Sequence, residues 1–152
     1  MRFIARSIIR TTPARLFAFH ELPDAVDRLM PPWERARVFE RAPDLHPGRR
    51  AVASIRLFFG VSMRIESVHT VYEPPFRFED EQLRGPFRRW HHTHIIEPHP
   101  DGAVLIDDVD FEPPFALISG WIVKRRLRRL FEYRHCMTRE WCERADSAKI
   151  AS

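Results

Sequence analysis

The feature that most constrains this chain is a series of short β-type segments that leads into one long helical segment. From about residue 35 to residue 112, apolar and β-branched stretches are separated by breaks such as PDLHPG (43–48) and Gly85-Pro86. Proline, glycine and aspartate in these breaks are typical of turns. Connections this short between successive strands imply an antiparallel meander.

Six strands are expected in this region and one before it. The first segment alternates loosely and is rich in isoleucine, which also indicates a strand. The expected strands are 2–10, 35–41, 50–59, 62–72, 76–83, 88–97 and 103–112.

Two short helices are expected after the first strand. Thr12-Pro13 is an N-cap residue followed by proline at the first helical position, and ARLFAFHEL continues as a helix. A second helix opens at Pro23 and ends at Pro31-Pro32, because proline lacks an amide hydrogen and clashes with the preceding turn.

A long helix, roughly residues 115–145, begins after Pro113-Pro114. A curved antiparallel sheet must cover its apolar face, and this helix is the available cover. The expected fold is therefore α+β: a seven-stranded curved antiparallel sheet wrapped around a long C-terminal helix, with two short helices after strand 1. The 152 residues suffice for one domain, residues 1–145, followed by a loose tail at 146–152.

Charge and composition favour a small cytoplasmic protein. The formal net charge is +4, and the basic run KRRLRRL (124–130) fits the outer face of an amphipathic helix, so no nucleic-acid partner is expected. No apolar stretch is long enough to span a bilayer, and charges interrupt the N-terminal apolar run, so neither membrane integration nor a signal peptide is expected. The two cysteines form no metal or disulfide motif, which favours a reducing compartment.

Three apolar residues of the long helix lie off its apolar stripe. Ile118, Trp121 and Ile122 fall on the polar side of the first turns. They are expected to pack under a loop, to line the mouth of a pocket, or to form a dimer patch. A monomer and a homodimer both stay open.

One arginine of the long helix falls inside the apolar stripe. On a helical wheel Arg134 lies between Leu130 and Met137. Because an arginine is almost never buried unpaired, three explanations are open. The first is an ion pair with an inward carboxylate, with Asp107 as the best candidate and Asp80 as the second; the others are snorkelling to an edge and contact with an anionic ligand.

The segment WHHTHIIEPH, residues 90–99, holds four histidines in ten positions. In a strand, alternate residues share a face, so His92 and His94 point the same way. Trp90 and Ile96 lie on that face and mark it as the core side. We therefore expect His92 and His94 inside the protein and His91 outside it.

Neighbouring strands add further polar residues to the inner face. The register expected for strands 76–83 and 88–97 sets Phe78 opposite His94 and Asp80 opposite His92. The expected interior polar set, in an aromatic shell, is His69, Asp80, His92, His94, Asp107 and Arg134. Buried polar groups must be paired, and a solid core rarely carries so many, so we expect a cavity that holds water or a ligand.

Four segments resemble the START-like superfamily, the Bet v 1-like or helix-grip group often labelled polyketide cyclase/dehydrase or SRPBCC. They are AFHELPDAVDRLMPPWE, FEDEQLRGPFRRWHHTHIIEP, LIDDVDF and LFEYRH. The resemblance covers about residues 3–141 and is closest to small bacterial members of unassigned function. It implies a helix-grip fold with a hydrophobic cavity between the sheet and the long helix, in a family whose members bind lipids, sterols, hormones and polyketides. His69 departs from the apolar residue usual at its position.

The leading functional hypothesis is a ligand-binding protein without a metal or other cofactor. The ligand would be a hydrophobic or amphipathic small molecule, lipid-, polyketide- or aromatic-like, in the cavity between sheet and helix. The expected ligand-binding residues are His69, Phe78, Asp80, Trp90, His92, His94, Asp107 and Arg134.

Three other functions stay open. One is a cyclase- or dehydratase-type enzyme with His/Asp acid–base chemistry in the same cavity, without a covalent nucleophile and with no catalytic residue assigned. Another is a metal-dependent site at His92 and His94, with His69 or Asp80 as the third ligand. The last is a partner-interaction module that uses the Ile118–Trp121 surface.

Overall fold

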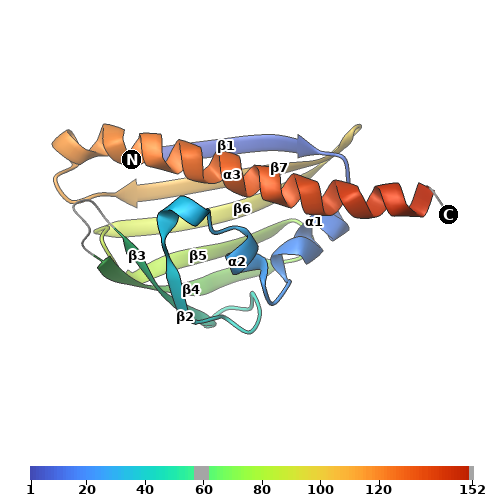
Figure 1. Ribbon diagram of the computed structural model, residues 1–152. Coiled ribbons are helices and arrows are strands. Elements are labelled where there is room, and N and C mark those ends of the chain that lie inside the picture. Colours follow the sequence, from blue (N-terminus) through green and yellow to red (C-terminus); the bar gives the residue numbers. More distant parts are fainter. Residues whose placement is uncertain (57–61, 151–152) are drawn as a thin grey trace.

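The computed structural model describes residues 1–56 and 62–150 and confirms the α+β fold expected from the sequence (Figure 1). Seven antiparallel strands form one curved sheet in the order β1-β7-β6-β5-β4-β3-β2. The strands are β1 (Arg2–Ile9), β2 (Arg37–Glu40), β3 (Arg50–Arg56), β4 (Ser62–Glu73), β5 (Arg77–Arg84), β6 (Arg89–His99) and β7 (Gly102–Glu112). The helices are α1 (Pro13–His20), α2 (Ala25–Arg28), the 3-10 helix η1 (Pro32–Glu34) and α3 (Ala116–Ile150).

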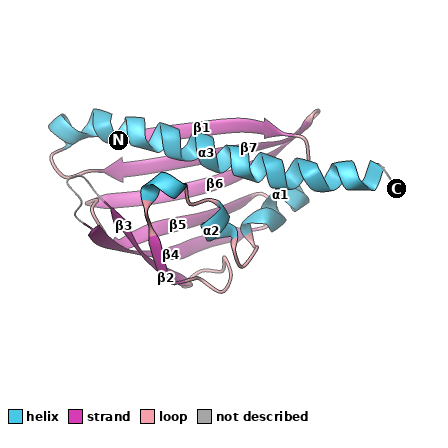
Figure 2. Cartoon of the chain, viewed as in Figure 1, coloured by secondary structure: helices cyan, strands magenta, loops and turns pink. Residues whose placement is uncertain are grey.

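The helices cover one side of the sheet. The long helix α3 runs along β1 and packs against β1 and β7, while α1 packs against β6, β7 and α3 (Figure 2). The start of α1 follows the N-cap expectation, since Thr12 Oγ1 accepts a hydrogen bond from the Arg15 amide at 3.3 Å. Together α1 and α3 bury the inner face of β1, β7 and β6.

Element boundaries differ from expectation where the chain lacks a clear stop signal. Helix α3 continues to Ile150, although a loose tail was expected from residue 146. No proline or glycine occurs after Gly120, so nothing in the sequence terminates this helix. The unexpected η1 follows Pro31, and the end of the expected strand 50–59 lies outside the described residues.

The buried stripe of α3 differs from the stripe expected on the helical wheel. It consists of Leu127, Phe131, His135, Thr138 and Cys142, which recur every three or four residues. The expected stripe was centred on Arg134, so it was wrong by one residue. Consequently α3 turns His135, and not Arg134, toward the sheet.

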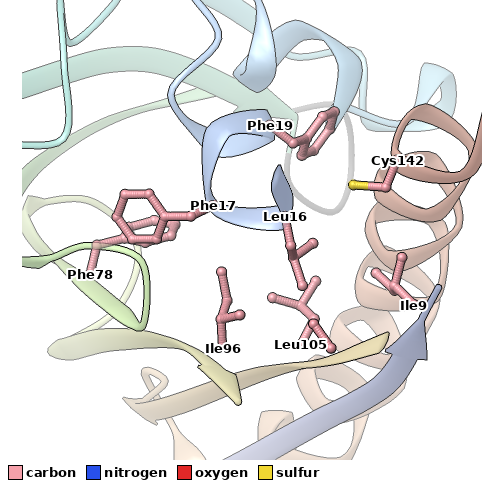
Figure 3. Close-up of a cluster of buried hydrophobic side chains, with 9 residues drawn as sticks. Ile9, Leu16, Phe17, Phe19, Phe78, Ile96, Leu105 and Cys142 are labelled. Carbon is pink, nitrogen blue, oxygen red and sulfur yellow. The ribbon is translucent and has the colours of Figure 1, made fainter. Parts of the chain in front are cut away.

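Two apolar clusters fill the space between sheet and helices. The first cluster, drawn in Figure 3, contains Ile9, Leu16, Phe17, Phe19, Phe78, Ile96, Ala103, Leu105 and Cys142. The second contains Val109, Phe111, Leu127 and Phe131. On β7, Asp107 lies between Leu105 of the first cluster and Val109 of the second. A band of polar side chains therefore crosses the sheet between the two apolar clusters.

The helix surface expected to form a pocket mouth or a dimer patch is largely exposed where it is described. Trp121 is 64% exposed and the preceding Phe115 is 78% exposed, whereas the side chain of Ile118 lies outside the described residues. A dimer through this surface stays a prediction. None of the helices in the described ranges is long and apolar enough to cross a membrane.

Candidate functional site

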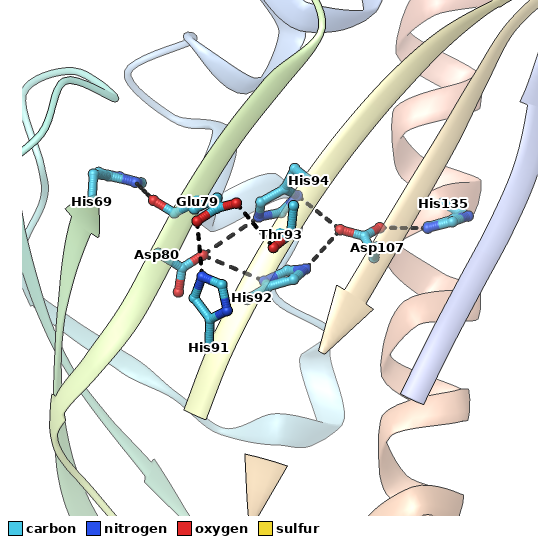
Figure 4. A network of polar contacts seen from close by, with 9 residues as sticks. All are labelled: His69, Glu79, Asp80, His91, His92, Thr93, His94, Asp107 and His135. Atoms are coloured by element: carbon cyan, nitrogen blue, oxygen red, sulfur yellow. Dashed lines mark hydrogen bonds and ion pairs between the residues drawn. The ribbon is translucent and has the colours of Figure 1, made fainter. Parts of the chain in front are cut away.

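The register of β5, β6 and β7 brings two carboxylates and two imidazoles together on the inner face of the sheet. Asp80 lies opposite His92, as the sequence predicts, and His94 lies opposite Asp107. From the helical side, His135 of α3 reaches the same place (Figure 4). We call these five residues, Asp80, His92, His94, Asp107 and His135, the Asp–His cluster.

Asp107 is the centre of the cluster and is only 3% exposed. Its Oδ1 lies 2.8 Å from His92 Nε2 and 2.8 Å from His94 Nδ1, although the His94 contact lacks the alignment of a hydrogen bond. Its Oδ2 accepts a hydrogen bond from His135 Nε2 at 2.6 Å. Burial alone would raise the pKa of Asp107, but the three imidazoles hold it well below its usual range. Asp107 is therefore an ionised carboxylate in the protein interior.

Asp80 forms the opposite wall of the cluster and is its most accessible member. Its Oδ2 lies 3.4 Å from His92 Nδ1 and 3.5 Å from His94 Nε2, and its side chain is 20% exposed. Burial opposes ionisation, but the two imidazoles lower the pKa of Asp80 below its ordinary value. Each of the two β6 histidines thus has one ring nitrogen toward each carboxylate.

The two carboxylates act strongly on His92. Burial would lower its pKa, but hydrogen bonds to Asp107 and Asp80 raise the pKa to about 9. At neutral pH His92 is therefore a positively charged imidazolium that bridges two negative groups. This arrangement supplies the charge balance that the two ionised carboxylates require in the interior.

Aromatic rings hold the imidazoles of the cluster in place. Phe78 stacks on His94 with ring centroids 3.9 Å apart, and Phe131 of α3 meets His92 edge-on at 5.2 Å. A further buried histidine, His20 of α1, lies 5.7 Å from His94 and donates from Nδ1 to the Leu16 carbonyl at 3.0 Å. Burial lowers the pKa of His20 to about 3, so this ring is neutral.

The expected ion pair between Arg134 and Asp107 is wrong. Arg134 Nε donates to the Leu29 carbonyl at 3.3 Å, and the guanidinium lies 5.3 Å from the centre of the Phe131 ring. Burial lowers the pKa of Arg134. Within the described part of the chain its two terminal nitrogens, Nη1 and Nη2, make no hydrogen bond. Histidines, instead of Arg134, contact the carboxylate of Asp107.

His135 is the member of the cluster that sequence reasoning missed. Its Nε2 contacts Asp107, and its Nδ1 lies 2.8 Å from the hydroxyl of Ser7 on β1. The available signal was its spacing of four residues from Phe131, which places both on one helix face. Ser7, His135 and Asp107 therefore link β1, α3 and β7 through side-chain contacts.

The remaining predicted site residues lie at the margin of the cluster. His69 lies opposite Asp80 on β4 and is half-buried, with Nδ1 3.4 Å from the Glu79 carbonyl. Trp90 packs on Phe111 in the second apolar cluster, and its ring lies edge-on to His92 with ring centroids 6.5 Å apart. His91 points to the outer face, as expected, where its Nε2 lies 2.9 Å from the buried carboxylate of Glu79.

Beyond His69 and Ser67 of β4, the inner face of the sheet becomes apolar. Ile65 and Met63 of β4 lie on the same face as His69, and they pair with Ala53 and Ile55 of β3. All four side chains are half-buried. Together with Ala51, which pairs with Ser67, they form what we call the inner strip: Ala51, Ala53, Ile55, Met63 and Ile65. On β4, Ser67 and His69 separate it from the accessible carboxylate of Asp80.

Grooves on the surface lie elsewhere. One of about 590 Å³ runs between the short helices and α3 and is bordered by Phe19, Tyr133 and Trp141 among others. Another of about 650 Å³ lies at the end of β1, beside Arg139. Neither groove is lined by a residue of the Asp–His cluster.

Three members of the cluster meet the geometric requirement for a metal site. Ligand atoms of Asp80, His92 and His94 all lie within 4.8 Å of one another. His69, the other candidate for a third ligand, is not part of this set.

Comparison with known proteins places the fold among small bacterial proteins. A family model described as "Domain of unknown function (DUF8410)" matches residues 7–141, and no curated protein matches the chain. Protein TTHA0849 of Thermus thermophilus is 16% identical with a TM-score of 0.71, covering 95% of this chain and 99% of that one. Protein NE0264 of Nitrosomonas europaea is 9% identical with a TM-score of 0.72, covering 97% of both chains. At these identities the likeness concerns the fold alone.

Proposed function

The chain belongs to the DUF8410 family, whose function is unknown, and we therefore propose a function from its own geometry: it binds an amphipathic organic molecule on the inner face of the sheet. The single observation that carries this proposal is the inner strip, a row of half-buried apolar side chains that is separated from Asp80 by Ser67 and His69 of β4. Covering such a row with a ligand is favourable by about 25 cal/mol for each Å² of apolar surface that is removed from water.

The polar end of the ligand would meet Arg134. The two terminal nitrogens of its guanidinium make no hydrogen bond within the described residues, and burial disfavours its charge. A carboxylate, sulfonate or carbonyl oxygen would satisfy these donors and restore favourable charge. The ligand class is thus an apolar or aromatic body with one acceptor group at its end.

The two β6 histidines would act on such a ligand indirectly. Both ring nitrogens of His92 and of His94 already face carboxylates, so neither ring offers a free nitrogen to a substrate. This geometry favours binding over a cyclase or dehydratase mechanism, in which a histidine must exchange a proton with the substrate.

We also propose that the chain is a START-like, SRPBCC-type protein. The order of elements, the curved seven-stranded sheet and the long C-terminal helix support this assignment. The resemblance implies a ligand cavity between the sheet and the long helix, and the inner strip lies on that face of the sheet.

A titration with 8-anilinonaphthalene-1-sulfonate, an aromatic anion, tests the binding proposal. We expect saturable binding of one molecule per folded chain, weakened about tenfold, or 1.4 kcal/mol, by Ile65→Gln. The matched control is Ile4→Gln, because Ile4 is 52% exposed on the outer face of β1. Equal affinities of the two variants, or no saturable binding to the folded protein, would contradict the proposal.

A native mass spectrum of freshly purified protein gives an independent check. An excess of a few hundred daltons over the denatured mass is the expected sign of a captured organic ligand. Arg134→Leu should lower the fraction of the protein that carries this excess mass, since it removes the group proposed to hold the polar end of the ligand.

A further inference from the structure

We propose that Asp80, His92 and His94 bind one divalent transition-metal ion, with zinc as the reference ion. This inference goes beyond the binding of an organic molecule and does not depend on it. It rests on three observations: the distances among the facing ligand atoms, the partners of the opposite ring nitrogens, and the packing that fixes the rings.

The distances suit a tetrahedral ion. Zinc bonds to imidazole nitrogen and carboxylate oxygen are about 2.0–2.1 Å long, which sets neighbouring ligand atoms roughly 3.3 Å apart. Asp80 Oδ2 lies 3.4 Å from His92 Nδ1 and 3.5 Å from His94 Nε2. The ligand atoms of the three residues all lie within 4.8 Å of one another, so both carboxylate–imidazole distances already fit an ion among them.

The opposite nitrogens of both rings face one carboxylate. His92 Nε2 and His94 Nδ1 each lie 2.8 Å from Asp107 Oδ1. Metal-binding histidines usually donate their other N–H to such a group, which fixes the tautomer and makes the ligating nitrogen more basic. Asp107 thus accepts a hydrogen bond from the His92 ring and lies beside the corresponding nitrogen of His94.

A divalent ion would take the place of the proton that the His92 imidazolium holds toward Asp80. When His92 donates from Nε2 to Asp107 as a neutral ring, its Nδ1 lone pair faces the negative Asp80 oxygen across 3.4 Å. The same holds for His94 Nε2 across 3.5 Å. These contacts repel unless a proton or a cation lies between them. One divalent ion would satisfy both contacts at once and balance the two carboxylates.

The surrounding residues hold this arrangement rigid. His135 binds the second oxygen of Asp107, Phe78 stacks on His94, and Phe131 packs edge-on against His92. Asp80 is 20% exposed, which leaves a route for a water or a ligand oxygen to occupy a fourth position. Two imidazoles and one carboxylate favour zinc, iron, cobalt or nickel over magnesium and calcium, which prefer oxygen alone.

Calorimetric titration of the full chain with zinc chloride tests the proposal. The protein is prepared without an affinity tag and treated with a chelator first, because eight histidines make surface binding a concern. We expect one ion per chain with a Kd of micromolar or tighter, and Co²⁺ in its place should give the visible absorption of a low-symmetry site. A Kd weaker than about 1 mM, or the absence of a one-to-one end point, would overturn the proposal.

Two ligand variants and one matched control locate the site. Asp80→Asn and His94→Gln should each weaken zinc binding by about 100-fold, whereas His69→Gln should change it less than about threefold. His69 is a suitable control because it lies opposite Asp80 but is not part of the three-residue set. If His94→Gln does not fold, Asp80→Asn decides the matter. Equal losses in Asp80→Asn and His69→Gln would place the ion elsewhere and refute the assignment.

Discussion

Buried histidines in this protein differ in charge because their neighbours differ. His92 lies between two carboxylates, which raise its pKa to about 9, whereas burial lowers the pKa of His20 to about 3. The two rings are both close to His94, so their difference comes from partners and not from depth. The two histidines therefore make the stability of the fold depend on pH in opposite senses.

His20 should make the metal-free protein sensitive to mild acid. Its folded pKa is about 3 and lies below the unfolded value of 6.5, so its contribution to stability is complete above pH 6.5 and is lost as the pH falls toward 3. In that window the free energy of unfolding should fall by up to about 1.4 kcal/mol per pH unit through this group alone.

Urea unfolding between pH 6.5 and 4 measures this effect. His20→Gln keeps a donor for the Leu16 carbonyl but cannot be protonated, so its stability should fall less steeply than that of the unmodified protein. His46→Gln, at a side chain that is 57% exposed, serves as the control. Parallel curves for the unmodified protein and His20→Gln would show that His20 is not the titrating group.

Arg134→Leu should leave the fold almost as stable as before. Removing one partner of a buried ion pair costs about 3–5 kcal/mol, but among the residues that the structure describes the Arg134 side chain forms no ion pair; it donates to the Leu29 carbonyl and lies over the Phe131 ring. We therefore expect a loss below about 1 kcal/mol in a thermal or urea melt. A loss of about 3 kcal/mol or more would mean that Arg134 balances the charge of Asp107 or Asp80 after all.

At this scale the sequence predicted which β-strand residues point inward but not which helical ones do. Strand alternation has a period of two, and so His92, His94, Asp80 and Asp107 were placed correctly. The buried stripe of α3 is broad and includes the polar residues His135 and Thr138. The pattern of apolar residues therefore predicted Arg134, and not His135, on the inner face of the helix. An error of one residue on a helix is a rotation of about 100°, which exchanges an inner residue for an edge residue.

Among the secondary-structure elements, the hairpin between β6 and β7 depends on one glycine. Gly102 has φ +139, and a Cβ there would lie 2.2 Å from the Ile9 carbonyl oxygen at the end of β1. Gly102→Ala should therefore destabilise the protein by about 2–3 kcal/mol through backbone strain and this clash.

Gly48→Ala is the matched control for this prediction. Gly48 also has positive φ, +86, but a Cβ there would meet nothing within 4 Å. Its replacement should cost about 1 kcal/mol from backbone conformation alone. Urea melts of the two variants compare them directly, and a smaller loss for Gly102→Ala than for Gly48→Ala would contradict the proposed close approach to β1.

The ends of the strands were easier to predict than the end of the long helix, because proline and glycine residues mark the strand boundaries. The breaks at Gly85-Pro86 and before Gly102 correspond to the ends of β5 and β6. Helix α3 has no such residue after Gly120 and extends to Ile150. The interior polar residues pair with one another, as His92 and His135 do with Asp107, so their number alone does not require a cavity, and the expected cavity stays a prediction.

In the whole molecule, Asp107 is the point at which the sheet and the long helix are joined. It receives His92 and His94 from β6 and His135 from α3, and His135 in turn contacts Ser7 of β1. Four imidazole or hydroxyl groups thus depend on one carboxylate for their orientation. Loss of this carboxylate should weaken the packing of α3 on the sheet as well as the cluster itself.

Asp107→Asn should therefore destabilise the whole fold by about 3 kcal/mol or more, because it leaves the His92 imidazolium with one buried counter-charge instead of two. The neighbouring Asp108→Asn is the control, since Asp108 points to the outer face and pairs with Arg2, whose side chain is 66% exposed. A surface pair of this kind contributes about 1 kcal/mol at most. The two substitutions lie at neighbouring positions of β7 but on opposite faces of the sheet. Equal losses of unfolding free energy in urea melts of the two variants would show that the buried cluster does not hold the sheet and the helix together.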